Sequence, residues 1–144
     1  MTEERASYTT GCIPKVVFIA HPFSGDLEGN IEKCRKLCRQ IVLQFPDVVP
    51  IATILLFPQF INENNPSERF LGLDLSRQVE YRCDEVWFAP GWKQSKGCIN
   101  ELKEAACRQM TVRFMHHVDR DYSRIELYPR LDPQIPSMEG ARKP

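Results

Sequence analysis

The stretch that decides the fold class is Lys15-Val-Val-Phe-Ile-Ala20, followed directly by His21-Pro-Phe-Ser-Gly-Asp26. The first six residues form an apolar run rich in β-branched side chains, which is typical of a strand covered on both faces. The next six are rich in turn-forming residues. Apolar residues then recur at helical spacing, which predicts a helix over Leu27–Phe45. A buried strand, a turn and an amphipathic helix in this order indicate an α/β protein.

The same alternation continues along the chain. A second helix is expected to begin at Asn65, because Asn65-Pro66-Ser67-Glu68 combines an N-cap residue, a first-turn proline and an acid three residues after the cap. Short connections between strands and helices predict a parallel sheet with right-handed crossovers. The further strands are expected at Ile51–Phe57, Asp84–Ala89, Thr111–Met115 and Ile125–Tyr128, and the further helices at Asn65–Arg82 and Cys98–Gln109.

Length and composition restrict the class of protein. The 144 residues suffice for one domain, expected at residues 14–128 between a flexible leader (1–13) and a Pro-rich C-terminal tail (129–144). Lys+Arg and Asp+Glu are both 19, so no net field attracts nucleic acid. The polar N-terminus is unlike a signal peptide and no apolar run could span a bilayer, so we expect a cytoplasmic protein that binds neither membrane nor nucleic acid.

The cysteines and glycines indicate neither a metal nor a cofactor. The six cysteines include no Cys-x-x-Cys pair and no histidine at ligand spacing, so we interpret them as buried or half-buried thiols. The chain contains no Gly-x-Gly-x-x-Gly and no Walker-type loop, which disfavours a dehydrogenase or an NTPase.

In a parallel sheet the ligand crevice lies outside the carboxyl ends of the strands. Residues 21–26, 57–65 and 90–97 should meet there, and two acids on the adjoining helices are candidates for chemistry. On a helical wheel Asp74 falls within the arc of Phe70, Leu71 and Leu75, where an acid is costly unless it is paired or functional. Glu101, one turn into the third helix, has small neighbours, although an acid there also complements the helix dipole. Two converging carboxylates could divide the work of breaking a glycosidic bond.

Several loop residues are candidates for ligand binding, each with a structural alternative. Polar and glycine residues near the two helix starts could cradle an anion, although they also suit ordinary helix capping. His21 could contact a ligand or simply bond to the backbone, and the loop aromatics could stack on a base or cover the core edge. These candidates are His21, Phe23, Ser24, Gly25, Asn30, Pro90, Trp92, Ser95 and Gly97.

The residues resemble the nucleoside 2-deoxyribosyltransferase-like superfamily, above all its small bacterial and phage members. The resemblance covers about residues 15–115, and its most specific part is Pro-Gly-Trp-x-x-Ser-x-Gly-x-x-x-Glu from Pro90 to Glu101. It also rests on Phe18–Asp26, Asn30, Asp74 and Cys83–Trp87.

The resemblance implies a flavodoxin-like or Rossmann-like three-layer sandwich with a central parallel sheet of four to five strands. It also implies an N-glycosidase or (deoxy)ribosyltransferase that cleaves the base–sugar bond of a nucleoside, a nucleotide or a nucleotide-derived signal. Glu101 would be the nucleophile, Asp74 would assist, and Ser95 and Gly97 would hold the sugar or a 5′-phosphate.

Related enzymes complete their sites with a neighbouring subunit, which implies a homodimer or larger oligomer that needs no cofactor. The resemblance also makes Phe18 a candidate for substrate binding. Phe18 stands where such enzymes often carry a tyrosine, and His21 where a glycine is common. A non-catalytic nucleotide-binding protein is therefore the main alternative, and a scaffold with a vestigial pocket is a third.

Overall fold

The structure, a computed structural model, describes residues 14–118 and 124–128. The expected leader (1–13) and the expected tail (129–144) lie outside the described residues. No helix in the described part of the chain combines the length and the apolar character needed to cross a membrane.

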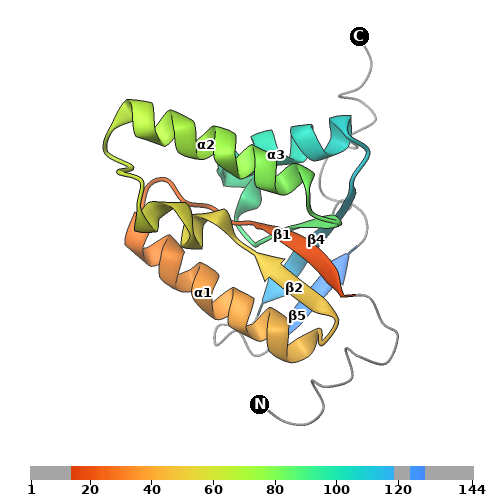
Figure 1. The fold of residues 1–144 in the computed structure, drawn as a ribbon. Helices are drawn as coiled ribbons and strands as arrows, with labels where there is room; N and C mark the ends of the chain where they lie inside the picture. Colours follow the sequence, from red (N-terminus) through yellow and green to blue (C-terminus); the bar gives the residue numbers. More distant parts are fainter. Residues whose placement is uncertain (1–13, 119–123, 129–144) are drawn as a thin grey trace.

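The centre of the molecule is a five-stranded, mostly parallel sheet (Figure 1). Its order is β2-β1-β3-β4-β5, and β5 alone runs antiparallel, against β4. The predicted α/β class is confirmed, and the arrangement is consistent with a Rossmann-like fold. The strands are β1 (Lys15–Ala20), β2 (Val48–Ile51), β3 (Glu85–Phe88), β4 (Thr111–Val118) and β5 (Ile125–Tyr128).

Three helices connect the parallel strands: α1 (Leu27–Gln44), α2 (Pro66–Tyr81) and α3 (Lys96–Cys107). Each begins after a side chain that accepts a hydrogen bond from a backbone N–H of the first turn: Asp26, Asn65 and Ser95 respectively. These caps satisfy donors that a helix otherwise leaves unpaired, so the helix starts are set locally by the sequence.

Alternate residues of β1 contribute to two separate hydrophobic clusters. Val17 and Ile19 belong to the cluster that includes the buried side of α1, whereas Phe18 and Ala20 belong to the cluster that includes the buried side of α3. Because successive strand residues point to opposite faces, β1 is covered on both sides, as its apolar run predicts.

The predicted strand over Ile51–Phe57 is wrong. Strand β2 is shorter and earlier, and the apolar residues after it form two 3₁₀ turns, η2 (Thr53–Leu55) and η3 (Phe57–Gln59). Pro50 lacks a backbone N–H but is tolerated because β2 lies at the sheet edge. The later residues instead bond locally, for example Leu55 N to the Ala52 carbonyl at 3.0 Å.

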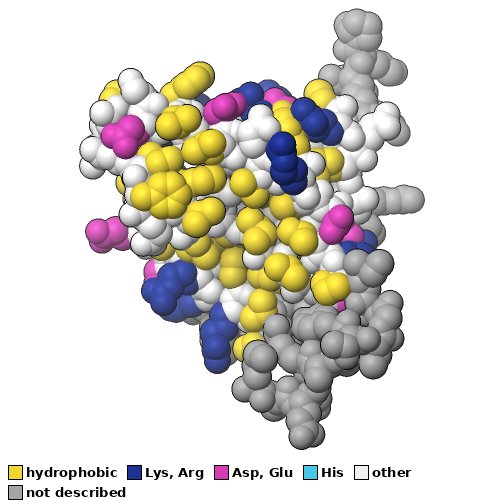
Figure 2. Space-filling model, in the orientation of Figure 1, with side chains coloured by type: hydrophobic (Ala, Val, Ile, Leu, Met, Phe, Trp, Pro, Cys, Tyr) yellow, Lys and Arg dark blue, Asp and Glu magenta, His cyan; other side chains and the backbone are white. Residues whose placement is uncertain are grey.

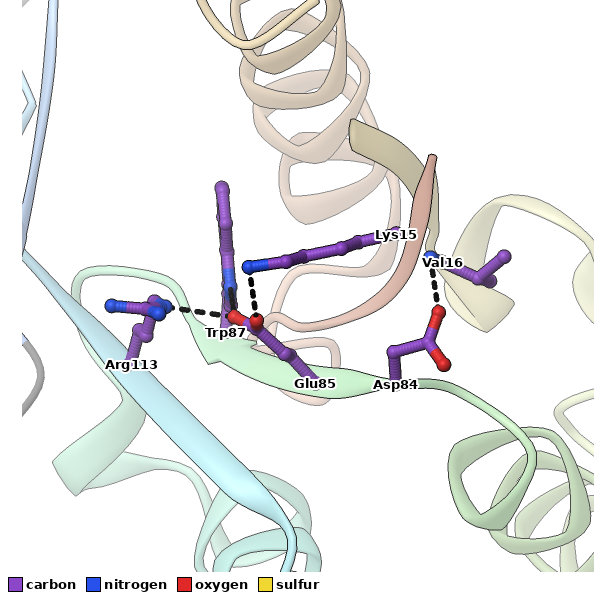
Figure 3. A network of polar contacts seen from close by, with 6 residues as sticks. All are labelled: Lys15, Val16, Asp84, Glu85, Trp87 and Arg113. Atoms are coloured by element: carbon purple, nitrogen blue, oxygen red, sulfur yellow. Dashed lines mark hydrogen bonds and ion pairs between the residues drawn. The ribbon is translucent and has the colours of Figure 1, made fainter. Parts of the chain in front are cut away.

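The amino-terminal edge of β3 is fixed by a polar network (Figure 3). The buried carboxylate of Glu85 accepts hydrogen bonds from Trp87 Nε1 at 3.0 Å and from Arg113 Nε at 2.7 Å, and it pairs with Lys15 Nζ at 3.0 Å. Beside it, Asp84 Oδ2 accepts from the backbone N–H of Val16 at 2.8 Å. These contacts join β1, β3 and β4 near the amino-terminal ends of the strands, whereas the predicted ligand crevice lies at their carboxyl ends.

Candidate functional site

The loops after β1 and β3 lie side by side. The two strands are paired up to Ala20 and Phe88, and the N–H of Ala89 donates to the Ala20 carbonyl at 2.9 Å. Just beyond, a methyl group placed on Gly91 would contact Cγ of Pro22 at 3.5 Å. The chain leaves β1 toward β2 on one side and reaches β3 on the other, so the strand order reverses here. Such a switch point is where open α/β sheets bind ligands.

The loop after β1 also contacts the segment before α2, through Arg69, a residue that was not among the predicted site residues. Arg69, in the first turn of α2, donates from Nη2 to Ser24 Oγ at 2.7 Å. Its Nη1 lies 3.7 Å from Glu63 Oε2, in the segment between η3 and α2. The predicted convergence of residues 21–26 and 57–65 therefore depends on Arg69. Its position one turn after the Asn65 cap was the available signal, since it places the side chain at the same end of the sheet.

The loop after β1 is held largely by its own polar side chains. His21 is buried, and its Nδ1 donates to the Pro22 carbonyl at 2.7 Å. Burial lowers the pKa of His21, against the effect of that backbone hydrogen bond, and the charge of Lys33 lowers it further. The Asn30 amide donates to the Phe23 carbonyl at 3.0 Å. His21 and Asn30 therefore both bond to backbone carbonyls of their own loop. Phe23, in the same loop, is half-buried.

Two glycines in these loops have positive φ, Gly25 at 98° and Gly91 at 87°. Residues other than glycine rarely adopt a positive φ, so each of these turns requires its glycine. Ser24 and Pro90 are exposed beside them.

The start of α3 has the geometry of a capped helix. Ser95 Oγ accepts from the Cys98 N–H at 3.2 Å, which is the structural alternative considered for Ser95. Gly97 is exposed, and a methyl group there would meet no atom closer than Ser95 Oγ at 3.8 Å among the described residues. Lys96 and Gly97, the first two residues of α3, are exposed, whereas the Cys98 N–H is already bonded to Ser95.

Two aromatic candidates lie in the core. Trp92 is 6% exposed, and its ring centroid lies 5.1 Å from that of Phe114 and 5.8 Å from that of Phe88. Phe18 is 1% exposed in the same cluster. Because both rings are buried, neither has an exposed face on which a base could stack, and both side chains pack in the core below the loops.

Asp74 does not face the core, and the expectation from the helical wheel is wrong. The side of α2 turned toward the domain carries the buried Gly72 and the half-buried Ser76 and Val79. Asp74 is two residues from Gly72, which at about 100° per residue places it on the opposite side of the helix. Its carboxylate is exposed, as are Phe70 and Leu71 in the same arc. The structure does not bring Asp74 and Glu101 together.

Glu101 lies in α3, and one of its carboxyl oxygens has no hydrogen-bond partner among the described residues. Its Oε2 atom is buried and has no hydrogen-bond partner within residues 14–118 and 124–128. Burial raises the pKa of Glu101 well above its ordinary value, and the charge of Glu80 raises it further. A buried acceptor left without a donor costs free energy, so such atoms commonly mark a site completed by something else.

The acid that accompanies Glu101 is Glu80, in the last turn of α2. Glu80 is 1% exposed, and its Oε2 also has no hydrogen-bond partner in the part of the chain that the structure describes. Burial raises its pKa to about 8, with a further contribution from Glu104, while Arg77 and Arg108 act in the opposite direction. Gly72, Ser76 and Glu80 recur every four residues. That spacing was the signal for a packed helix face, although glycine and serine hid it from a search for apolar residues.

Tyr81, at the end of α2, contacts two residues at the end of α3. Glu104 Oε2 accepts a hydrogen bond from the Tyr81 hydroxyl at 2.5 Å, and the Arg108 guanidinium lies 3.2 Å from the centroid of the Tyr81 ring. Glu104 therefore has a partner, which distinguishes it from Glu80 and Glu101. The described residues contain no group of His, Cys, Asp and Glu side chains arranged to hold a metal ion.

The fold and the site define an α/β domain with polar loops at a strand switch point and two buried acids between the adjoining helices. The chain belongs to the family described as Domain of unknown function (DUF7768), which matches residues 15–115. That range extends from β1 into β4 and contains Glu80, Glu101 and the loop candidates. No curated protein sequence matches the chain significantly.

Proposed function

We propose that this protein is an N-glycosidase or (deoxy)ribosyltransferase acting on a nucleoside, a nucleotide or a nucleotide-derived signal, with Glu101 as the group that attacks the anomeric carbon. The proposal takes the domain as a flavodoxin-like three-layer sandwich with its ligand at the β1/β3 switch point. The observation that carries it is the buried Oε2 of Glu101, for which the described residues supply no hydrogen bond.

The surroundings of the strand ends support a ligand with an anionic part. Arg69 and Ser24 lie together beside the start of α1, and the first two residues of α3, Lys96 and Gly97, are exposed. Helix N-termini and arginine side chains both favour phosphate or carboxylate groups. A 5′-phosphate is thus the group that these loops suit best.

The protonation of Glu101 gives this reaction a pH dependence. A nucleophile must be a carboxylate, and burial together with Glu80 raises the pKa of Glu101. The acid limb of the kcat/KM profile should therefore lie above the ordinary range of a glutamic acid, and activity should rise with pH.

The first experiment measures release of free base by chromatography from a panel of nucleosides and nucleoside monophosphates. Glu101→Gln keeps the shape of the side chain and removes its charge. It should lower base release by several powers of ten while leaving ligand binding largely intact. Glu32→Gln is the matched control, because it removes one carboxylate from an exposed pair with Arg35 on α1. Wild-type protein that releases no base from any compound, or a fully active Glu101→Gln variant, would refute the assignment.

The second candidate function is capture of a nucleotide without turnover, and the raised pKa of Glu101 favours it. A neutral carboxyl group donates one hydrogen bond and accepts others, as a binding residue would. Under this alternative wild-type protein binds a nucleotide and releases no base, and Glu101→Gln changes the affinity alone.

We also propose that two copies of the chain associate through α2. Phe70, Leu71 and Leu73 are exposed on this helix around Asp74. Hydrophobic side chains gather over α2 and the segment before it (Figure 2). If two α2 helices pack antiparallel about a two-fold axis, Asp74 of one copy can face Arg77 of the other, three residues along the same side. Such an interface would cover the apolar side chains and give Asp74 a partner.

A further inference from the structure

We propose that Glu80 and Glu101 act as one acid pair across the α2–α3 interface, in which Glu80 is a positioning residue that controls whether Glu101 is protonated. The consequence for catalysis rests on the proposed function, but the pair itself does not.

The geometry comes from two facing helices. Glu80 lies in the last turn of α2, on the face of that helix that packs against the domain, and α2 contacts α3. Glu101 lies within α3, and the charge of Glu80 acts on its carboxyl group. Both Oε2 atoms are buried and lack a hydrogen-bond donor among residues 14–118 and 124–128. Each of the two atoms is therefore a buried acceptor that needs a proton of its own carboxyl group or a donor from outside.

The charged neighbours do not neutralise the pair. Arg77 on α2 and Arg108 at the end of α3 both act on Glu80 from a distance, but the described residues show no ion pair between either arginine and Glu80 or Glu101. Glu104 adds negative charge and is bonded to Tyr81. The charges of Glu80 and Glu101 act on the thiols of Cys83 and Cys98 respectively. Burial raises the pKa of Cys83 to about 11 and that of Cys98 to about 12, so both thiols are neutral at pH 7.

Two buried carboxyl groups in this setting cannot both ionise at neutral pH. Desolvation disfavours each carboxylate, and the first negative charge opposes the second, so the pair keeps at least one proton. Its titration then belongs to the pair and not to either residue alone. When the pair holds one proton, Glu101 is a carboxylate only while that proton is on Glu80.

The pair can be tested without any substrate. In protein labelled with ¹³C at the glutamate carboxyl carbons, the signals of Glu80 and Glu101 should titrate above the ordinary value of about 4.3, and each should respond to both steps. In Glu80→Gln the Glu101 step should move to lower pH by on the order of one unit, because the opposing charge is gone. Glu32→Gln, with the same change in net charge on α1, should leave the Glu101 step in place.

The inference is overturned if Glu101 titrates at the same pH in wild type and in Glu80→Gln, or if both acids titrate in the ordinary range. Should Glu80→Gln fail to fold, Glu101→Gln gives the reciprocal measurement, in which the Glu80 signal loses its response to the second step. A coupled titration in a protein that releases no base would keep the pair and reject the enzyme. In an active enzyme, Glu80→Gln should also move the acid limb of kcat/KM to lower pH, which a purely structural role would not do.

Discussion

Glu85 lies at the start of β3 and is buried like Glu80, yet its surroundings have the opposite effect. Burial by itself would raise the pKa of Glu85, but hydrogen bonds from Trp87, Arg113 and Lys15 outweigh it and hold the pKa at about 2 (Figure 3). The Lys15 side chain is 49% exposed and that of Arg113 is 32% exposed, so solvent weakens both ion pairs. The difference between the two glutamates is therefore the supply of donors and not the degree of burial.

Replacing Glu85 by glutamine should lower the free energy of unfolding at pH 7 by about 1–3 kcal/mol, because Arg113 and Lys15 lose their anionic partner. Because the folded pKa is depressed, this stabilisation is fully present above the unfolded value of 4.5 and is lost as pH falls toward about 2. Urea unfolding of wild type and Glu85→Gln at several pH values measures the difference. A gap between them that stays constant down to pH 2 would contradict the assignment.

At the level of elements, the first turn of α2 and the loop after β1 form one unit through Arg69 and Ser24. If this unit binds a phosphate, Arg69→Gln should weaken binding of a nucleoside monophosphate by about tenfold or more, because a charged hydrogen bond is lost. Binding of the matching nucleoside should change little. Calorimetry with both ligands distinguishes the two effects, and Arg82→Gln, at the other end of α2, is the control. Equal weakening for both ligands would mean that Arg69 only supports the loop.

The helices were easier to predict than the strand between them. Asn65 caps α2 as predicted, since a cap involves residues only two or three positions apart. The third helix begins at Lys96 after the Ser95 cap, two residues before the predicted Cys98. The strand prediction over Ile51–Phe57 was wrong because hydrophobicity alone does not distinguish an edge strand from partly buried 3₁₀ turns. The wheel of α2 misled for a related reason, since its packed face is built on Gly72, Ser76 and Glu80.

At the level of the whole molecule, the exposed face of α2 decides the expected oligomeric state. Phe70 is 75% exposed, and Leu71 and Leu73 are exposed on either side. If this face joins two copies, wild type should sediment as a dimer and Phe70→Glu as a monomer, because a buried unpaired charge opposes the contact. Leu43→Glu alters an equally prominent exposed leucine on α1 and should leave the dimer intact. A monomeric wild type at high protein concentration, or a dimeric Phe70→Glu, would exclude this interface.

The sequence by itself determined the α/β class, the buried strands β1 and β3 and the starts of α1 and α2, because these depend on periodicity and on residues close together in the chain. Tertiary structure alone decided that Asp74 faces outward, that Trp92 belongs to the core, and that Arg69 reaches Ser24. It also decided that Glu80, on the helix that contacts α3, is the acid whose charge raises the pKa of Glu101. A side chain's partner across two helices depends on how those helices pack, and packing on α2 is specified by small residues that carry no hydrophobic signal.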